Sequence, residues 1–283
     1  MKRYTQEIIN TASEMYLRGS SQESISRRLN IPSGSIWGIL KNISQEQRKK
    51  MPLGYKPKHI LPNSSRKMSN AKSRILGYIS SEGHVAFRKD LRKRYCLKKN
   101  GKKGYKIVTN KSARIAFYNT DKSLIDKYIE DIFRVYNIKT VYYKKRSEVA
   151  INSIELYKDL SRYGSFKSNE WKIPGEVLAS PHFRKEWLKA FYDGEAHIED
   201  RGKSFRIILN SVNKKGLSSI KHGILNKMGI TSKIYGPYYT KNFKIFRLII
   251  SEKRSLIRFY GGINFYHKEK KEKLQKLLKI YSY

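Results

Sequence analysis

The sequence predicts an α+β protein in which one unit, helix–strand–strand–helix–strand–strand–helix, occurs twice after a small helical domain. Two observations carry this prediction. The first 41 residues read as three short amphipathic helices, and everything after residue 69 repeats itself once. We therefore expect a helical domain at 1–41, a linker at 42–68, a first repeat at 69–175 and a second at 176–283.

The N-terminal domain is expected to resemble a helix-turn-helix. Residues 6–17 carry apolar side chains at helical spacing, Ser20 with Glu23 forms a capping box, and Ser33 can begin a third helix. Two short helices joined by a tight turn are typical of DNA-binding domains, although a plain helical hairpin packed on its neighbour would leave the same pattern. The candidate DNA-contacting residues here are Ser35 and Lys41.

The linker holds three of the seven prolines, with basic and small polar residues between them. Such a segment is extended and semi-rigid, and it can follow a phosphate backbone.

Each repeat opens with a helix-like segment, 73–85 in the first and 186–198 in the second, that ends in Glu, a small residue, His and a β-branched residue. The next predicted helix of each copy closes at Asn137 and at Gly229. Within the opening helices, small residues stand four apart at Gly77 and Ser81, and at Ala190 and Gly194.

Residues four apart lie on one helix face, and small side chains there let two helices pack more closely than usual. Two such helices in contact would bring Glu82 and Glu195 together at the same end. Adjacent carboxylates repel unless a cation lies between them, and Mg²⁺ or Mn²⁺ is the cation that such oxygen ligands favour.

Residues 75–83 and 188–196 resemble the two copies of the signature of the LAGLIDADG homing endonucleases, in their single-chain, two-motif form. The likeness extends over roughly 69–283, and it departs from the family pattern at Ser80, where an acid is usual, and at Ala196. It implies a pseudo-twofold interface between the motif helices and saddle-shaped antiparallel sheets over the DNA major groove. It also implies divalent metal, a monomer on a long asymmetric duplex site, and a role in intron or intein mobility.

The resemblance also implies the site residues. The metal ligands would be Glu82 and Glu195, with the backbone carbonyls of Ser81 and Gly194. The basic residues near the reaction would be Lys167 and Lys270, with Lys268 close to the second. Arg and Lys side chains pair with guanine edges in the major groove, so the candidate readers are Arg88, Arg92, Arg94, Arg201, Arg206, Lys233, Lys244 and Arg247.

Composition agrees with a folded nucleic-acid binder. The chain has 61 Lys and Arg against 23 Asp and Glu, a net charge of +38, and 12% aromatic residues, which excludes a disordered basic tail. The single cysteine, Cys96, excludes an internal disulfide framework, and the polar N-terminus and lack of a long apolar run predict an intracellular protein, cytoplasmic or organellar.

The expected function is site-specific, metal-dependent cleavage of double-stranded DNA. Two alternatives share the same fold: a DNA-binding regulator that no longer cuts, and an RNA maturase that assists intron splicing.

Overall fold

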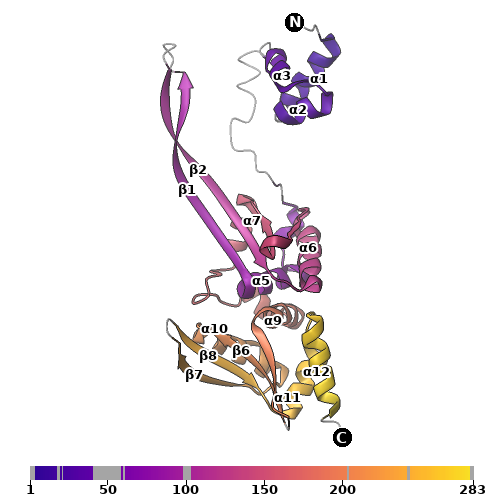
Figure 1. The fold of residues 1–283 in the computed structure, drawn as a ribbon, viewed down its shortest axis with the longest axis vertical. Helices are drawn as coiled ribbons and strands as arrows, with labels where there is room; N and C mark the ends of the chain where they lie inside the picture. Colours follow the sequence, from indigo (N-terminus) through magenta and orange to yellow (C-terminus); the bar gives the residue numbers. More distant parts are fainter. Residues whose placement is uncertain are drawn as a thin grey trace. The chain divides into compact units, whose positions relative to one another are not determined.

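The computed structural model describes residues 4–17, 20, 22–40, 59, 61–97, 103–202, 204–240 and 243–280. The chain divides into two compact units, residues 1–56 and 57–283 (Figure 1). None of the helices in the described residues is both long enough and apolar enough to cross a membrane.

The first unit consists of three helices, α1 (Gln6–Leu17), α2 (Gln22–Leu29) and α3 (Ser33–Leu40). Its small core contains Ala12, Ile25 and Ile36, one from each helix. Ser35 is half-buried on α3, whereas the predicted contact Lys41 lies outside the described residues.

The first half of the second unit carries one four-stranded antiparallel sheet in the order β1-β2-β4-β3. Its elements are a 3-10 turn η1 (Asn63–Arg66), α5 (Asn70–Glu82), β1 (Gly83–Leu97), β2 (Lys103–Tyr118), α6 (Lys122–Tyr136), β3 (Tyr142–Tyr143), η2 (Lys144–Arg146), β4 (Glu148–Ile151) and α7 (Ile154–Ser161).

The second half has the equivalent sheet in the order β5-β6-β8-β7. Its elements are α8 (Gly175–Ala179), α9 (Pro181–Glu195), β5 (Ala196–Asp200), β6 (Phe205–Ser211), α10 (Lys214–Ile220), η3 (Lys221–Leu225), η4 (Asn226–Met228), β7 (Lys233–Tyr239), β8 (Lys244–Ile250), α11 (Lys253–Gly262) and α12 (Lys268–Ile280). The left-handed residues Asn137 and Gly229 end the middle helices of the two halves, as the repeat predicted. The α+β fold of two repeats is thereby confirmed.

Alternation along the strands gives each sheet one buried and one open face. In the second sheet Ile207 and Leu248 face the core, while Arg206 and Arg247 take the other face. In the first sheet Phe87 stacks on Tyr157 of α7, with ring centroids 4.9 Å apart. The arginines that alternate with Phe87 therefore lie on the face away from the helices.

The two halves meet where α5 packs against α9. A Cβ at Gly77 would lie only 2.4 Å from the carbonyl oxygen of Trp187 and 2.9 Å from Cβ of Ala190. The predicted close helix contact through small residues is thus present, and only glycine fits at this point. The buried Arg74 of α5 adds ion pairs to Asp131 of α6, at 2.7 Å, and to Glu186 of α9.

The Gly77 contact predicts a specific loss of stability. Gly77→Ala should lower the free energy of unfolding by about 1–3 kcal/mol, because the added methyl forces the helices apart. The matched control is Gly261→Ala in α11, where a Cβ has nothing within 4 Å and alanine is the better helix former. Urea unfolding followed by tryptophan fluorescence measures both variants; equal stability of the two would contradict the close contact.

Candidate functional site

The two motif helices, α5 and α9, pack side by side, and each ends at its glutamate. Glu82 is the last residue of α5 and Glu195 the last of α9, so the helix pairing places both acids at one end of the contact. A Cβ at Gly194 would lie 2.5 Å from Oγ of Ser81 and 2.8 Å from Cγ of Glu82. Gly194 therefore lets the end of α5, with its glutamate, lie directly against the end of α9.

This packing makes it energetically unfavourable for both glutamates to be ionised. Partial burial, together with the charge of Glu82, raises the pKa of Glu195 to about 7. Burial likewise raises the pKa of Glu82, and nearby Lys270 offsets part of the rise in both. The negative ends of both helix dipoles point the same way, so the site attracts cations.

Lys270 supplies a positive charge at this site from the start of α12. Its Nζ donates a hydrogen bond to the backbone carbonyl of Asp193, at 2.5 Å. Burial lowers the pKa of Lys270, whereas Asp193, Glu82 and Glu195 raise it in turn. The ammonium therefore lies close enough to both glutamates to interact with them electrostatically.

The donor set fits a hard divalent cation. Within the described part of the chain, no three His, Cys, Asp or Glu side chains cluster as metal ligands. Two carboxylates remain, and the last carbonyls of each helix lack partners within the helix. Carboxylate and carbonyl oxygens with free coordination positions for water suit Mg²⁺ or Mn²⁺.

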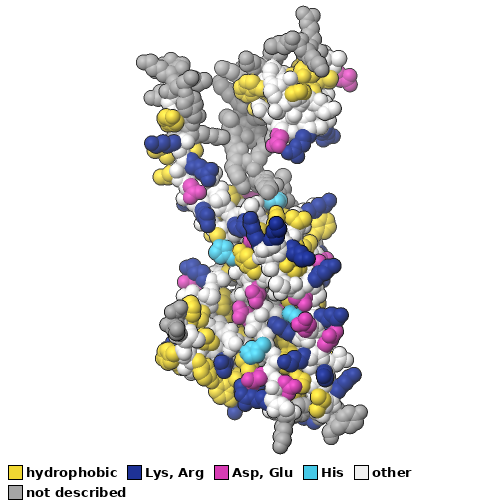
Figure 2. Space-filling model, viewed as in Figure 1, with side chains coloured by type: hydrophobic (Ala, Val, Ile, Leu, Met, Phe, Trp, Pro, Cys, Tyr) yellow, Lys and Arg dark blue, Asp and Glu magenta, His cyan; other side chains and the backbone are white. Residues whose placement is uncertain are grey.

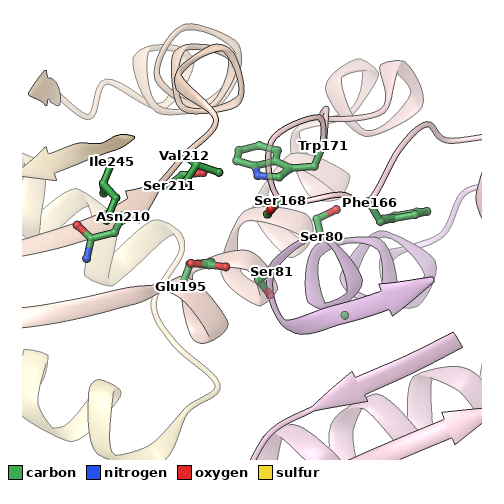
Figure 3. A pocket seen from close by; sticks show the side chains of 11 residues that line it. Ser80, Ser81, Phe166, Ser168, Trp171, Glu195, Asn210, Ser211, Val212 and Ile245 are labelled. Atoms are coloured by element: carbon green, nitrogen blue, oxygen red, sulfur yellow. The ribbon is translucent and has the colours of Figure 1, made fainter. Parts of the chain in front are cut away.

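A cavity of about 290 Å³ opens beside Glu195. Figure 3 shows the Glu195 carboxylate directed into it, with Ser81 of α5 on one side and Asn210 of β6 on the other. Trp171, which is 2% exposed, and Ser168 close its far wall. The lining is polar at the glutamate and apolar at Trp171.

The other predicted basic residues lie away from the glutamates. The Lys167 side chain is 74% exposed and pairs with Glu170 at 3.3 Å. Lys268 is exposed and lies 4.0 Å from Glu272. The two candidate lysines of the sequence analysis thus differ in the structure, since only Lys270 reaches the ends of the motif helices.

The Arg and Lys side chains predicted to contact base edges do not all lie on the same face of the sheets. Arg88 and Arg92 lie on the open face of the first sheet. Arg94 is in register opposite Lys106, and its side chain is outside the described residues.

In the second sheet Arg206 pairs with Glu199, which also binds the exposed Arg201 at 2.9 Å. Lys233 is level with Ile249 on the open face, next to Arg247. Lys244 shares the face of Phe246 and lies 6.0 Å from its ring.

A basic and aromatic groove of about 540 Å³ lies on the first sheet and was not predicted from the sequence. Its charged and aromatic lining residues are Arg114, Tyr142, Tyr143, Lys144, Lys145 and Arg146. Arg114 is held by the buried Glu148 at 2.6 Å. The run of three basic residues, Lys144-Lys145-Arg146, was the sequence feature that could have predicted this groove.

Lys and Arg side chains, dark blue in Figure 2, spread over both halves of the second unit on the face in view.

Asp193 also was not predicted as a site residue from the sequence. Its carboxylate is buried and accepts hydrogen bonds from the backbone N–H groups of Tyr266 and His267, each at 3.0 Å. The signal was its position in the second motif, where the first motif has Ser80.

Comparisons with known proteins point to one family. A model of the LAGLIDADG-like domain matches residues 182–264, within the second repeat. The homing endonuclease I-ApeI of Aeropyrum pernix is 26% identical over 175 residues, which cover 58% of this chain and 77% of that protein.

Two solved structures were also compared. The LAGLIDADG homing endonuclease I-LtrWI bound to target DNA aligns with a TM-score of 0.45 at 13% identity, over 75% of this chain and 91% of that one. Full-length DUF199/WhiA from Thermotoga maritima aligns with a TM-score of 0.44 at 11% identity, over 79% of this chain and 62% of that one. The domain match and I-ApeI support the relation of this chain to the LAGLIDADG homing endonucleases that the duplicated motif indicated.

Proposed function

We propose that this chain is a site-specific, divalent-metal-dependent endonuclease that cuts both strands of duplex DNA. The observation that carries the proposal is the pair Glu82 and Glu195, held together at the ends of two glycine-packed helices. Side chains placed only to finish two helices would face solvent, whereas these are partly buried with raised pKa values. A protein that only binds DNA has no use for two carboxylates beside phosphates.

Each residue of the site would have a separate role in phosphodiester hydrolysis. Glu82 and Glu195, with the carbonyls of Ser81 and Gly194, would hold Mg²⁺ or Mn²⁺, which when bound supplies an activated water and stabilises negative charge on the phosphate. Lys270 adds a fixed positive charge next to the glutamates, where charge develops during hydrolysis. The helix contact keeps these groups in one arrangement before DNA arrives.

The open faces of the two sheets would bind the duplex. They carry arginines and lysines on a chain of charge +38, and the relative I-ApeI is named a homing endonuclease. One chain supplies both halves, so we propose that it acts as a monomer. Because the halves differ in sequence, the preferred site would be long and asymmetric. The three-helix unit would add contacts through Ser35 and Lys41.

Removing either carboxylate charge tests the proposal. Glu82→Gln and Glu195→Gln preserve side-chain shape, and each should reduce cleavage of a selected duplex in Mg²⁺ by at least about 10²-fold, because the two acids act as one unit. The double variant should be little worse than either single one. Affinity for the duplex without metal should be unchanged or higher, because a negative charge beside phosphate is lost.

The matched control is Glu272→Gln on the exposed side of α12, which should cut normally. A Glu82→Gln protein that cuts at the wild-type rate would remove the case for a nuclease centred here. A wild-type protein that binds one duplex tightly and cuts it in neither Mg²⁺ nor Mn²⁺ would favour the regulator.

Cation affinity should depend on pH through Glu195. With its pKa at about 7, the carboxyl is mostly protonated below neutrality and ionised above it. A proton and a cation compete for this group, so Mg²⁺ affinity should rise with pH and fall up to about tenfold per unit below pH ~6. Calorimetric titration of the protein with Mg²⁺ across roughly pH 5.5–8.5 measures this. A flat profile would show that Glu195 does not bind the ion.

The two faces of β1 should differ in their effect on sequence preference. Arg88→Ala, on the open face, should cost about 1–3 kcal/mol at one or two base pairs of the selected site. The neighbouring Lys89→Ala, on the opposite face, should leave sequence preference intact. Binding to a panel of single-base variants separates the two, and the same loss of discrimination in both proteins would contradict the assigned face.

A further inference from the structure

A cavity of about 310 Å³ lies near the start of the second unit, between the segment 59–66 and one face of α7. The α7 residues that line it share this face because they stand three or four positions apart, and they are Glu155, Lys158, Asp159 and Arg162. On the other side of α7, Tyr157 stacks on Phe87 of the first sheet. The helix therefore separates this cavity from the sheet.

A buried lysine holds the two walls of the cavity together. Lys72 of α5 is 0% exposed, and its Nζ lies 2.6 Å from Oδ2 of Asp159. The same ammonium donates a hydrogen bond to the backbone carbonyl of Ser65, at 2.5 Å. The hydroxyl of Tyr136 donates to Asp159 at 2.8 Å. Because breaking a buried ion pair leaves an unpaired charge, these contacts favour one arrangement of α7 and the segment 59–66. The cavity is thus formed before a ligand arrives.

The charges around the cavity leave an excess of positive charge. The carboxylate of Asp159 has the buried lysine as its partner, and Glu155 pairs with Lys158 at 2.9 Å. Arg66 is exposed and makes no ion pair with a described residue. The side chain of Arg162 is 62% exposed and lies 3.9 Å from Asp159, whose charge is already balanced. Two guanidinium groups therefore line the cavity without a carboxylate of their own.

This lining favours an oxyanion over a metal ion. Both carboxylates have lysine partners, and the described residues contain no group of three His, Cys, Asp or Glu side chains that could hold a metal. A guanidinium presents several N–H donors in a plane, which match the oxygens of a phosphate better than an ammonium does. Two such groups on opposite walls can bind one phosphate from two sides.

We propose that this cavity binds a phosphate group between Arg66 of the segment 59–66 and Arg162 of α7. The same oxygens are presented by the backbone of DNA and by a free phosphate ion. The net charge of +38 favours DNA as the source, because it raises the local concentration of nucleic acid. Such a phosphate would belong to DNA beyond the segment on the open sheet faces. This choice of source rests on the proposed DNA binding, whereas the phosphate site does not.

The first experiment titrates the full chain with inorganic phosphate alone and follows the backbone amide signals by NMR. Signals from 61–66 and 158–162 should shift together and give one affinity. Arg66→Ala/Arg162→Ala should weaken this binding at least about tenfold, because the charged hydrogen-bond donors are lost. Arg66→Lys/Arg162→Lys keeps both charges and should retain part of the affinity.

The matched control is Arg134→Ala/Arg254→Ala. It removes the same charge from two exposed arginines that do not line this cavity, and it should bind phosphate there as the wild-type protein does. Unshifted signals at 61–66 and 158–162 would overturn the site. An equal loss of affinity in the control and in Arg66→Ala/Arg162→Ala would overturn it as well, because the effect would then come from net charge alone.

The second experiment distinguishes the two sources with a selected duplex, used alone and extended by roughly two helical turns at each end. If the phosphate belongs to DNA, Arg66→Ala/Arg162→Ala should weaken binding of the extended duplex only. The slope of log affinity against log salt concentration should then fall by about one. If the ligand is a free ion, both duplexes should bind the variant and the wild-type protein equally, while the phosphate titrations still differ.

Cleavage of the short duplex in Mg²⁺ separates this site from the proposed nuclease. Arg66→Ala/Arg162→Ala should cut that duplex at the wild-type rate, since neither arginine lies at the paired glutamates. A wild-type protein that cuts no duplex but gives the expected phosphate titration would contradict the nuclease and support the phosphate site. Normal cleavage without the titration effect would do the reverse.

Discussion

The close contact between α5 and α9 is the constraint on which the rest of the second unit depends. Gly77 meets the backbone of α9, and Gly194 meets the side chains of Ser81 and Glu82 at the end of α5, so the helices pack closely at both points. The aromatic core around Trp187 and Phe191 stabilises this contact. The same contact forces Glu82 and Glu195 together, which is unfavourable for the protein alone. The core interactions therefore hold in place a carboxylate pair that a bound cation would stabilise.

Buried charged residues connect the α5–α9 contact to neighbouring elements. Arg74 ties α5 to α6 through Asp131 and to α9 through Glu186, and the hydroxyl of Tyr266 donates to Glu186 at 3.1 Å. Tyr266 in turn donates its backbone N–H to Asp193. A buried ion pair costs desolvation and is poor evidence of stability by itself, but breaking one partner leaves an unpaired charge. The network thus favours a single arrangement of the motif helices and of the segment that begins α12.

The sequence predicted the centre of the molecule better than its surroundings. The duplicated motif, with small residues four apart, predicted both the helix contact and the glutamate pair, because helical periodicity alone decides which residues share a face. Lys167 and Lys270 looked equivalent, since each follows a phenylalanine after the last helix of its repeat. Their difference depends on whether Asp193 or Ser80 reaches the following segment, and this is decided by tertiary hydrogen bonds. Lys244 and Arg247 were both predicted to contact bases, but they are an odd number of positions apart on β8 and so belong to opposite faces.

In our proposal the helix contact creates one cation site shared by Glu82 and Glu195. Anomalous diffraction at the manganese absorption edge, on crystals of the protein with a selected duplex and Mn²⁺, would locate the ion. We expect manganese bound by carboxylate oxygens of both glutamates, at about 2.0–2.2 Å. DNA on the sheets with no manganese at either glutamate, in crystals grown in excess Mn²⁺, would contradict it.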